Sequence, residues 1–309
     1  MAQIKPLTAE LQKIAIDELG EVPERIPEDL LALKTWIRQQ PHLRARDDDQ
    51  FLIQFLRGCK YSLEKAKVKL DLYFSLRTKY PEMLAVYDVD DAKFKEVFHL
   101  GCFTLLPTPL NENGPRILFY QYNYDATKMT IEEMYNPTSA MLELTILTDP
   151  YAGIHGLVYI FDMAKATTRH ILQLTPNVCK RAVTYLEKSL PLRVRGVYFI
   201  NVPNAALRIV KFITSLCSEK IQKKIYVLGH SVMDLTQYIP LKYLPIDYGG
   251  ENGLLRDLNR QYFKRFEQYR DYFRENAQYG TDESLRVGEN FDLDGLYGVG
   301  GSFRQLVVD

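Results

Sequence analysis

Cysteine is scarce in this 309-residue sequence, which contains four. No CxxC pair occurs among Cys59, Cys102, Cys179 and Cys217, so neither a zinc site nor a disulfide framework is indicated, and we expect free, buried thiols. An excess of either charge is also absent, because lysine plus arginine and aspartate plus glutamate both number 39. A global attraction to nucleic acid or to an anionic membrane is therefore excluded, and any such binding requires a local patch.

Long apolar runs are missing as well. No uncharged apolar stretch approaches the ~20 residues that span a bilayer, and the opening MAQIKPLTAEL lacks the apolar core of a signal peptide. We therefore expect a cytoplasmic protein. Its 46% hydrophobic and 25% charged residues are typical of a globular chain that can bury a large core.

The first hundred residues are predicted to be helical. Apolar residues recur at helical spacing after the capping residue Thr8, again from Leu30 to Ile37, and in a helix opened by Asp47 to Asp49. A longer amphipathic helix follows Ser62 and ends near Pro81. This part of the chain therefore reads as a helical bundle.

From about residue 100 the pattern changes to short segments rich in β-branched and aromatic residues, at 103–107, 116–123, 155–163, 195–203 and 225–229. Helical stretches separate the later segments, which predicts βαβ units and an α/β fold with a mostly parallel five-stranded sheet. The last three are nearly continuous in apolar residues, as is typical of strands covered on both faces. A charged helix from Leu254 to Tyr269 and a Gly-rich tail at 280–309 follow.

The stretch IYVLGHSVMD, 225–234, imitates the turn on which α/β-hydrolases present a nucleophilic serine. Met233 stands where that turn needs a small residue, and no histidine follows His230, although the hydrolase order requires one after the serine. We therefore predict that Ser231 caps a helix, and a lipid ester hydrolase using Ser231 remains a remote alternative.

Other chemical motifs are also lacking. The tail GLYGVGG follows no strand and opens no helix, no Walker A lysine motif occurs, and no histidine pair has metal-ligand spacing. No catalytic residue, cofactor or metal is therefore expected, and binding is favoured over catalysis.

The segment from Pro203 to Lys224 carries an apolar stripe through Ala206, Val210 and Ile213, with basic residues gathered toward its end. Two arginines lie at the start of the strand before this segment, and we expect the cations to meet them at one edge of the sheet. The full set is Arg193, Arg195, Lys220, Lys223 and Lys224. Such a patch would suit an anionic phosphate or membrane headgroup. A solvated charged face is the alternative.

Five blocks, in order and spacing, resemble the CRAL-TRIO family: FLIQFLRGCKYSLEKA (51–66), IFDMAKATTRHILQLTPNVCKR (160–181), LPLRVRGVYFINVP (190–203), FITSLCSEKIQKKIYVLG (212–229) and LPIDYGG (244–250). The resemblance is nearest to the branch of the α-tocopherol transfer and retinaldehyde-binding proteins, especially its insect members, whose tails end like GSFRQLVVD. It implies an N-terminal helical module at 1–95, a lipid-binding domain at 96–252, and a C-terminal helix and tail at 253–309 that pack on the core.

The resemblance also implies a deep apolar cavity over one face of the sheet, with 203–218 as a mobile lid. The implied cavity residues are Ser139, Leu157, Tyr159, Phe161, Tyr185, Leu186, Leu190, Leu192, Val194, Val197, Phe199, Val210 and Ile213. Plain core packing is the alternative for the wall residues among them. Glu143 would either face the cavity, where it would bond a ligand hydroxyl or favour a polyene aldehyde, or occupy an exposed helix position.

Basic residues of the family's phosphoinositide cleft match Arg193, Lys220 and Lys224, whereas Cys59 stands where that branch has an arginine, with Lys60 beside it. Phosphatidylinositol-transfer members hold the inositol phosphate with a Glu and a Thr, and those places carry Leu192 and Ile221 here. We therefore expect a monomeric, non-enzymatic carrier of a tocopherol, retinoid, carotenoid or similar isoprenoid that meets anionic membranes transiently and binds no nucleic acid. Phosphatidylinositol or phospholipid transfer, or phosphoinositide sensing, is the alternative.

Overall fold

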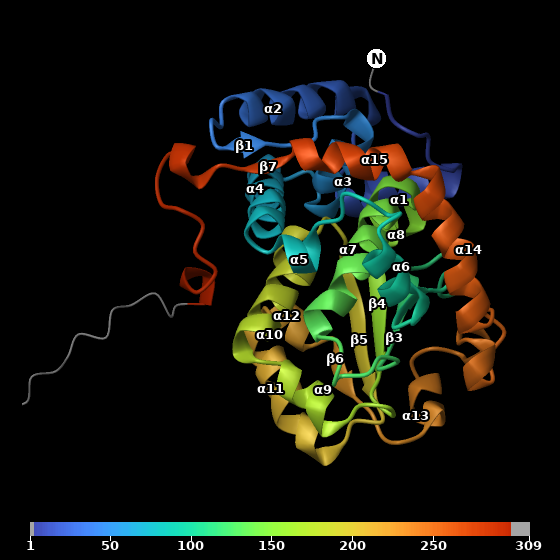
Figure 1. Ribbon diagram of the computed structural model, residues 1–309. Coiled ribbons are helices and arrows are strands. Elements are labelled where there is room, and N and C mark those ends of the chain that lie inside the picture. Colours follow the sequence, from blue (N-terminus) through green and yellow to red (C-terminus); the bar gives the residue numbers. More distant parts are fainter. Residues whose placement is uncertain (1–2, 298–309) are drawn as a thin grey trace, which may run out of the picture.

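The computed structural model describes residues 3–297, and helices dominate its N-terminal third. They are α1 (Ala9–Leu19), α2 (Ile26–Arg38), α3 (Asp49–Gly58), α4 (Leu63–Lys79), α5 (Pro81–Leu84) and α6 (Ala92–His99). The side chains of Thr8 and Asp48 accept hydrogen bonds at the N-termini of α1 and α3, and Gly20 ends α1 in the left-handed conformation. Figure 1 shows α1 to α3 gathered at one end of the molecule.

A five-stranded sheet forms the centre, with strand order β2-β3-β4-β5-β6. Its members are β2 (Phe103–Leu105), β3 (Arg116–Gln121), β4 (Leu157–Asp162), β5 (Val194–Ile200) and β6 (Ile225–Val227). β2 pairs antiparallel with β3 and the remaining pairs are parallel, so the predicted α/β architecture with a mostly parallel sheet is confirmed. β6 differs from the expectation of a strand covered on both faces, because it is a short edge strand whose Val227 is exposed.

The two faces of the sheet pack against different elements. One face, with Leu118, Tyr159 and Phe199, joins the large core that also takes in the helices before and after β4. The other face, with Phe119 and Ile160, packs on a smaller cluster that includes α13 (Val232–Thr236). The helices on the first side are α7 (Ile131–Thr148), α8 (Pro150–His155), α9 (Thr168–Gln173), α10 (Pro176–Val183), a π-helical turn (Thr184–Ser189), α11 (Leu207–Leu216) and α12 (Glu219–Gln222). In Figure 1, α10 and α11 lie to the left of the sheet, and the C-terminal α14 lies to the right, where it packs beside the edge strand β2.

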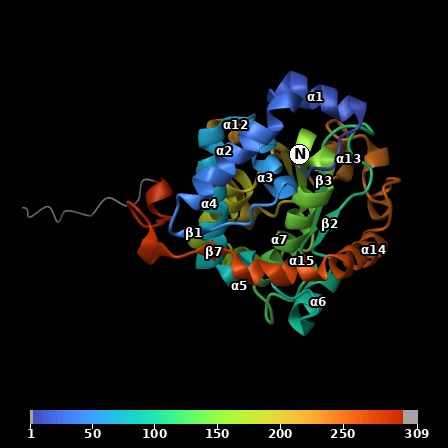
Figure 2. The same ribbon diagram turned by 90° about the horizontal axis from the view of Figure 1, so that it is seen from above.

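The C-terminal segment runs back over the helical end of the molecule. It consists of α14 (Leu255–Gln268), α15 (Arg270–Glu275) and β7 (Gly280–Thr281), and β7 pairs antiparallel with β1 (Leu43–Arg44), as the view from above shows (Figure 2). The first residues of the tail at 280–309 therefore form a short strand. The ending GSFRQLVVD lies outside the described residues. Within 3–297, no helix is both long enough and apolar enough to cross a membrane.

Candidate functional site: an apolar cavity beside a basic cleft

An apolar cavity of about 100 Å³ lies between the sheet and helices α7, α10 and α11. Strands β3 to β6 form its floor with Tyr120, Tyr122, Tyr159, Phe161, Val194, Val197, Phe199 and Ile225. The helices and their connections supply most of the walls, with Ile131, Tyr135, Leu174, Val178, Cys179, Ala182, Val183, Leu186, Ile209, Val210, Ile213, Cys217 and Ile221. Because binding pockets for small molecules measure roughly 300–1,000 Å³, a lipid enters this closed form only if the covering helices move apart.

Many of the residues expected in the cavity do line it, namely Tyr159, Phe161, Leu186, Val194, Val197, Phe199, Val210 and Ile213. Strict alternation would send Val194 and Val197 to opposite faces of the sheet. The register between β4 and β5 shifts between Leu157 and Val158, and this irregularity brings both valines to the cavity side.

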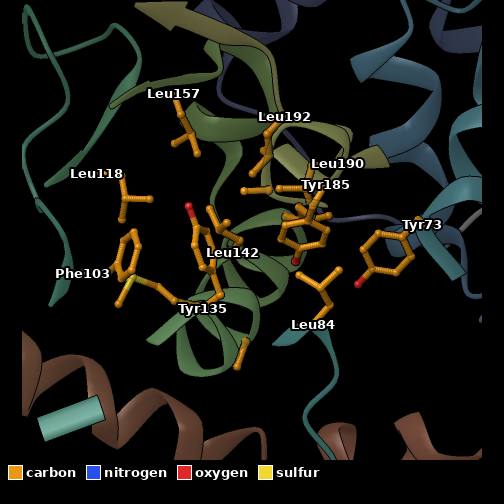
Figure 3. Packing of buried hydrophobic residues seen from close by; sticks show 14 of the residues in the cluster. Tyr73, Leu84, Phe103, Leu118, Tyr135, Leu142, Leu157, Tyr185, Leu190 and Leu192 are labelled. Atoms are coloured by element: carbon orange, nitrogen blue, oxygen red, sulfur yellow. The ribbon is translucent and has the colours of Figure 1, made fainter. Parts of the chain in front are cut away.

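The structure places the other expected residues outside the cavity: Ser139, Glu143, Leu157, Tyr185, Leu190 and Leu192. All six are buried, and the apolar ones belong to the large core. In Figure 3, Leu190, Leu192 and Tyr185 lie together, with the Tyr185 ring beside Leu190. The apolar residues among the six pack in the core, which was the alternative that the sequence had left open.

Glu143 neither faces the cavity nor occupies an exposed helix position, so both expectations for it are wrong. Its carboxylate accepts hydrogen bonds from Arg77 at 2.8 Å, Tyr272 at 3.0 Å and Asn276 at 3.0 Å. Burial disfavours the Arg77 cation, but Glu143 and the surrounding tyrosines hold its pKa above the ordinary arginine value. The pair is a structural ion bridge between α4 and α7.

The sequence reasoning missed the cavity residues of β3 and α10. Tyr120 on β3 and Tyr122 directly after β3 both face the cavity, and a period of two in RILFYQYN could have revealed them. On α10, a stripe through Val178, Ala182 and its neighbours has the spacing of a one-sided helix. Both patterns are visible in the sequence, but the pairing of β3 with β4 was needed to predict which face of the sheet lines the cavity.

The apolar stripe in 203–224 does not lie on one continuous helix. The segment consists of a short 3-10 turn (Asn204–Ala206), α11 and, after extended backbone at Cys217 and Ser218, the short α12. No side chain caps the N-terminus of α11, and Val210 is its fully buried residue. Within the described chain, one hydrogen-bond partner of 204–218 is distant in sequence: Glu187 accepts from the Ser218 backbone N–H at 3.2 Å. This segment, the gate, is therefore lightly attached.

The basic residues expected to bind headgroups meet in one cleft of about 260 Å³ beside the gate. We call it the basic cleft, and its charged members are Lys60, Lys69, Arg193, Arg195, Lys220 and Lys224, with Glu18 and Glu187. Arg195 pairs with Glu18 at 3.6 Å, whereas no carboxylate within 3–297 forms a salt bridge with Lys60, Lys220 or Lys224. Lys223 does not line it. The cleft therefore keeps a local positive excess in a chain of zero formal charge.

Two cations of the basic cleft are held against main-chain carbonyls. Arg193 donates to the carbonyls of Arg57 and Ile154, and Lys224 donates to that of Val194 at 2.8 Å. Burial, together with Arg195, lowers the pKa of Arg193 to about 10, and burial with the neighbouring cations lowers that of Lys224. This mutual repulsion would be relieved by a bound anion.

Lys69 is a cleft residue that the sequence did not single out. Its ammonium donates to the carbonyls of Glu187, Lys188 and Leu190, and burial lowers its pKa to about 8. It therefore ties α4 to the end of the π-helical turn that borders the cavity. Glu187 itself lines both the cavity and the basic cleft, as do Val194 and Ile221. The two sites share a wall.

Ser231 acts as the predicted helix cap. Its hydroxyl accepts a hydrogen bond from the Met233 backbone N–H at 3.1 Å, and Asp234 completes a capping box on α13. Within 3–297, Ser231 has no hydrogen bond to a histidine. The thiols also match expectation in part: all four are free, and Cys217 alone is half-buried, on the cavity wall.

Comparison with known proteins agrees with this geometry. Residues 103–250 match the model of the CRAL/TRIO domain, and residues 22–94 match the Pinta-like UBA domain. Clavesin-2 of Mus musculus is 28% identical over 251 residues, covering 81% of this chain and 75% of that protein. The alpha-tocopherol transfer protein-like protein of Mus musculus is 27% identical over 251 residues, covering 81% and 72%.

Among solved structures, the crystal structure of Sfh5 matches with a TM-score of 0.51 at 16% identity, covering 85% of this chain and 99% of that one. That likeness supports the fold. The domain match spans strands β2 to β6, helices α7 and α10 and the gate, and so includes all the elements that line the cavity. Residues 103–250 therefore form a CRAL/TRIO domain.

Proposed function

We propose that this protein binds a hydrophobic small molecule, an isoprenoid of the tocopherol, retinoid or carotenoid kind, and exchanges it at membranes as a monomeric cytoplasmic carrier. The observation that carries the proposal is the apolar cavity beneath a lightly attached gate. Burial of apolar surface is favourable by roughly 25 cal/mol per Å², so a large hydrophobic ligand would bind strongly without a charge pair. The similarity to an alpha-tocopherol transfer protein-like protein supports the same ligand class.

The basic cleft would guide the carrier to anionic or phosphoinositide headgroups. Arg193, Lys220, Lys224 and Lys60 would contribute the charge, with Lys69 as a further cation beside Cys59, where the related branch has an arginine. Leu192 and Ile221, at the places of the inositol-phosphate ligands in phosphatidylinositol carriers, offer no polar group to such a headgroup, which disfavours phosphatidylinositol as the cavity ligand. The module boundaries at 1–95, 96–252 and 253–309 belong to this proposal, and both matched domains lie within the first two.

Organic extraction and mass spectrometry of the purified protein test the proposal directly. We expect one apolar lipid per protein chain. Ala182→Phe should reduce lipid retention about tenfold, because the ring would fill a cavity of about 100 Å³ and overpacking costs ~1–3 kcal/mol. Ala92→Phe, on an exposed position of α6, is the matched control. Absence of any bound lipid, with no uptake from vesicles, would overturn the proposal, and equal retention in Ala182→Phe would exclude this cavity.

A second expectation concerns the rate of exchange. Glu187→Ala should speed transfer of a fluorescent tocopherol analogue between vesicles about fivefold, because it removes a contact of ~1 kcal/mol that holds the gate at Ser218. Glu219→Ala changes an exposed glutamate of α12 and should leave the rate unchanged. An unchanged rate in Glu187→Ala would show that the gate is held elsewhere.

A further inference from the structure

Two hydroxyl groups at the floor of the cavity have no hydrogen-bond partner among residues 3–297. They belong to Tyr120 on β3 and Tyr159 on β4, whose side chains are almost completely buried. A buried hydroxyl without a partner is destabilising, and phenylalanine would fill the same space without that penalty. Within the described residues the Tyr185 hydroxyl is also unpaired, but Tyr185 does not line the cavity, and the Tyr124 hydroxyl donates to Gln173 at 2.8 Å. The two unpaired hydroxyls are therefore free to bond a polar group of a bound molecule.

The sheet brings these two side chains to the same place. β3 and β4 are parallel neighbours in which Tyr120 pairs with Phe161 and Leu118 pairs with Tyr159. Tyr120 and Tyr159 are thus diagonal positions on one face, and aromatic side chains at such positions lie within reach of each other. Both line the cavity. One polar group of a bound molecule could therefore meet either hydroxyl or both.

The surroundings define the charge of that group. Burial and neighbouring tyrosines raise the pKa of Tyr120 and of Tyr159 far above the ordinary value, so both phenols stay protonated and can donate. Among the residues that the structure describes, no lysine or arginine lines the cavity and Glu187 is the one carboxylate that does; it accepts from Ser218 at the wall shared with the basic cleft. A carboxylate or phosphate would be buried here without a counter-charge, which is strongly unfavourable.

We propose that the cavity selects a lipid bearing a neutral oxygen, a hydroxyl or a carbonyl, and that Tyr120 and Tyr159 are the residues that recognise it. This inference rests on the proposed carrier function and sharpens its ligand class. It separates oxygenated isoprenoids from pure hydrocarbons on one side and from fatty acids and phospholipids on the other. A site with buried polar groups rejects an analogue that leaves them unpaired.

Matched probe pairs test the inference: retinol against its deoxy hydrocarbon, and zeaxanthin against β-carotene, each measured by equilibrium binding to the delipidated full chain. We expect the oxygenated member of a pair to bind at least tenfold more tightly. Tyr120→Phe/Tyr159→Phe should lose this preference and keep its affinity for the hydrocarbon. Tyr198→Phe, on the opposite face of the sheet, is the control and should keep the preference.

A measurement without ligand accompanies the binding assay. Because each replacement removes an unpaired hydroxyl, the delipidated double variant should melt at the same temperature as the natural protein or higher. Equal binding of both members of each pair, unchanged in the double variant, would overturn the inference while leaving the carrier function intact. Binding of no probe, together with no lipid in the extract, would overturn the carrier function and the inference with it.

Discussion

Replacement of Glu143 by leucine is expected to lower the free energy of unfolding by about 3–5 kcal/mol, as measured for the loss of one partner of a buried ion pair. The carboxylate lies 2.8 Å from the Arg77 guanidinium, and both side chains are almost completely buried. Without Glu143, the cation would stay in the core with no counter-charge, and the donors of Tyr272 and Asn276 would lose their acceptor. The effect should be on stability and not on the ligand, because Glu143 does not line the cavity.

Urea unfolding followed by circular dichroism measures this effect. Arg77→Met/Glu143→Leu should recover most of the loss, since an apolar pair of similar volume replaces a buried ion pair at little or no cost. Glu96→Leu, on an exposed position of α6, should change stability by less than about 0.5 kcal/mol. A loss below about 1 kcal/mol for Glu143→Leu would contradict the structural role assigned to the pair.

Removal of two cations from the basic cleft should weaken binding to anionic vesicles about thirtyfold. Lys60→Ala/Lys220→Ala removes exposed ammonium groups, and each basic residue near an anionic surface contributes ~1 kcal/mol, where 1.4 kcal/mol is a factor of ten. These two were chosen over Arg193 and Lys224 because the latter also bond main-chain carbonyls, so that their loss could disturb the fold.

Sedimentation with vesicles of phosphatidylcholine, with and without phosphatidylserine or a phosphoinositide, provides the measurement. Lys128→Ala/Lys264→Ala removes the same number of exposed lysines from outside the cleft and should have a small effect. The difference between the variants should shrink as salt is added, because screening weakens interactions between exposed charges. Equal losses in the two double variants would show that net charge, not the cleft, attracts the protein. A larger loss on phosphoinositide than on phosphatidylserine vesicles would mark headgroup preference.

The strands were predictable because each is a short run of β-branched and aromatic residues between helical stretches, and these runs hold even where β6 has become an exposed edge. The basic cleft was also predictable in outline. Arg193 precedes β5 and Lys220 precedes β6. Neighbouring parallel strands begin at the same end of the sheet, so the two side chains come close together. The position of a residue relative to a strand end thus carried three-dimensional information.

The cavity walls were harder to predict because core and cavity use the same side chains. Leu192 and Val194 are both apolar and two residues apart, yet the first is packed in the core and the second lines the cavity. Glu143 was unpredictable for another reason. Nearly every residue of α7 after Met134 is buried, so the apolar pattern does not show which side of the helix Glu143 faces. Its partner Arg77 also lies 66 residues earlier in the chain. The β1–β7 pairing rests on two-residue strands, too short for any pattern.

The wall that Glu187, Val194 and Ile221 form between the cavity and the basic cleft has a thermodynamic consequence. If a headgroup bound in the cleft lowers the affinity of the cavity for its ligand by some factor, the ligand must lower the affinity of the cleft for the headgroup by the same factor. Linkage between two binding equilibria is reciprocal. A loaded carrier would then leave an anionic bilayer more readily than an empty one. Headgroup binding and cargo release would thus be coupled at the membrane, while the direction of net transfer would follow the difference in the cargo's chemical potential between the two membranes.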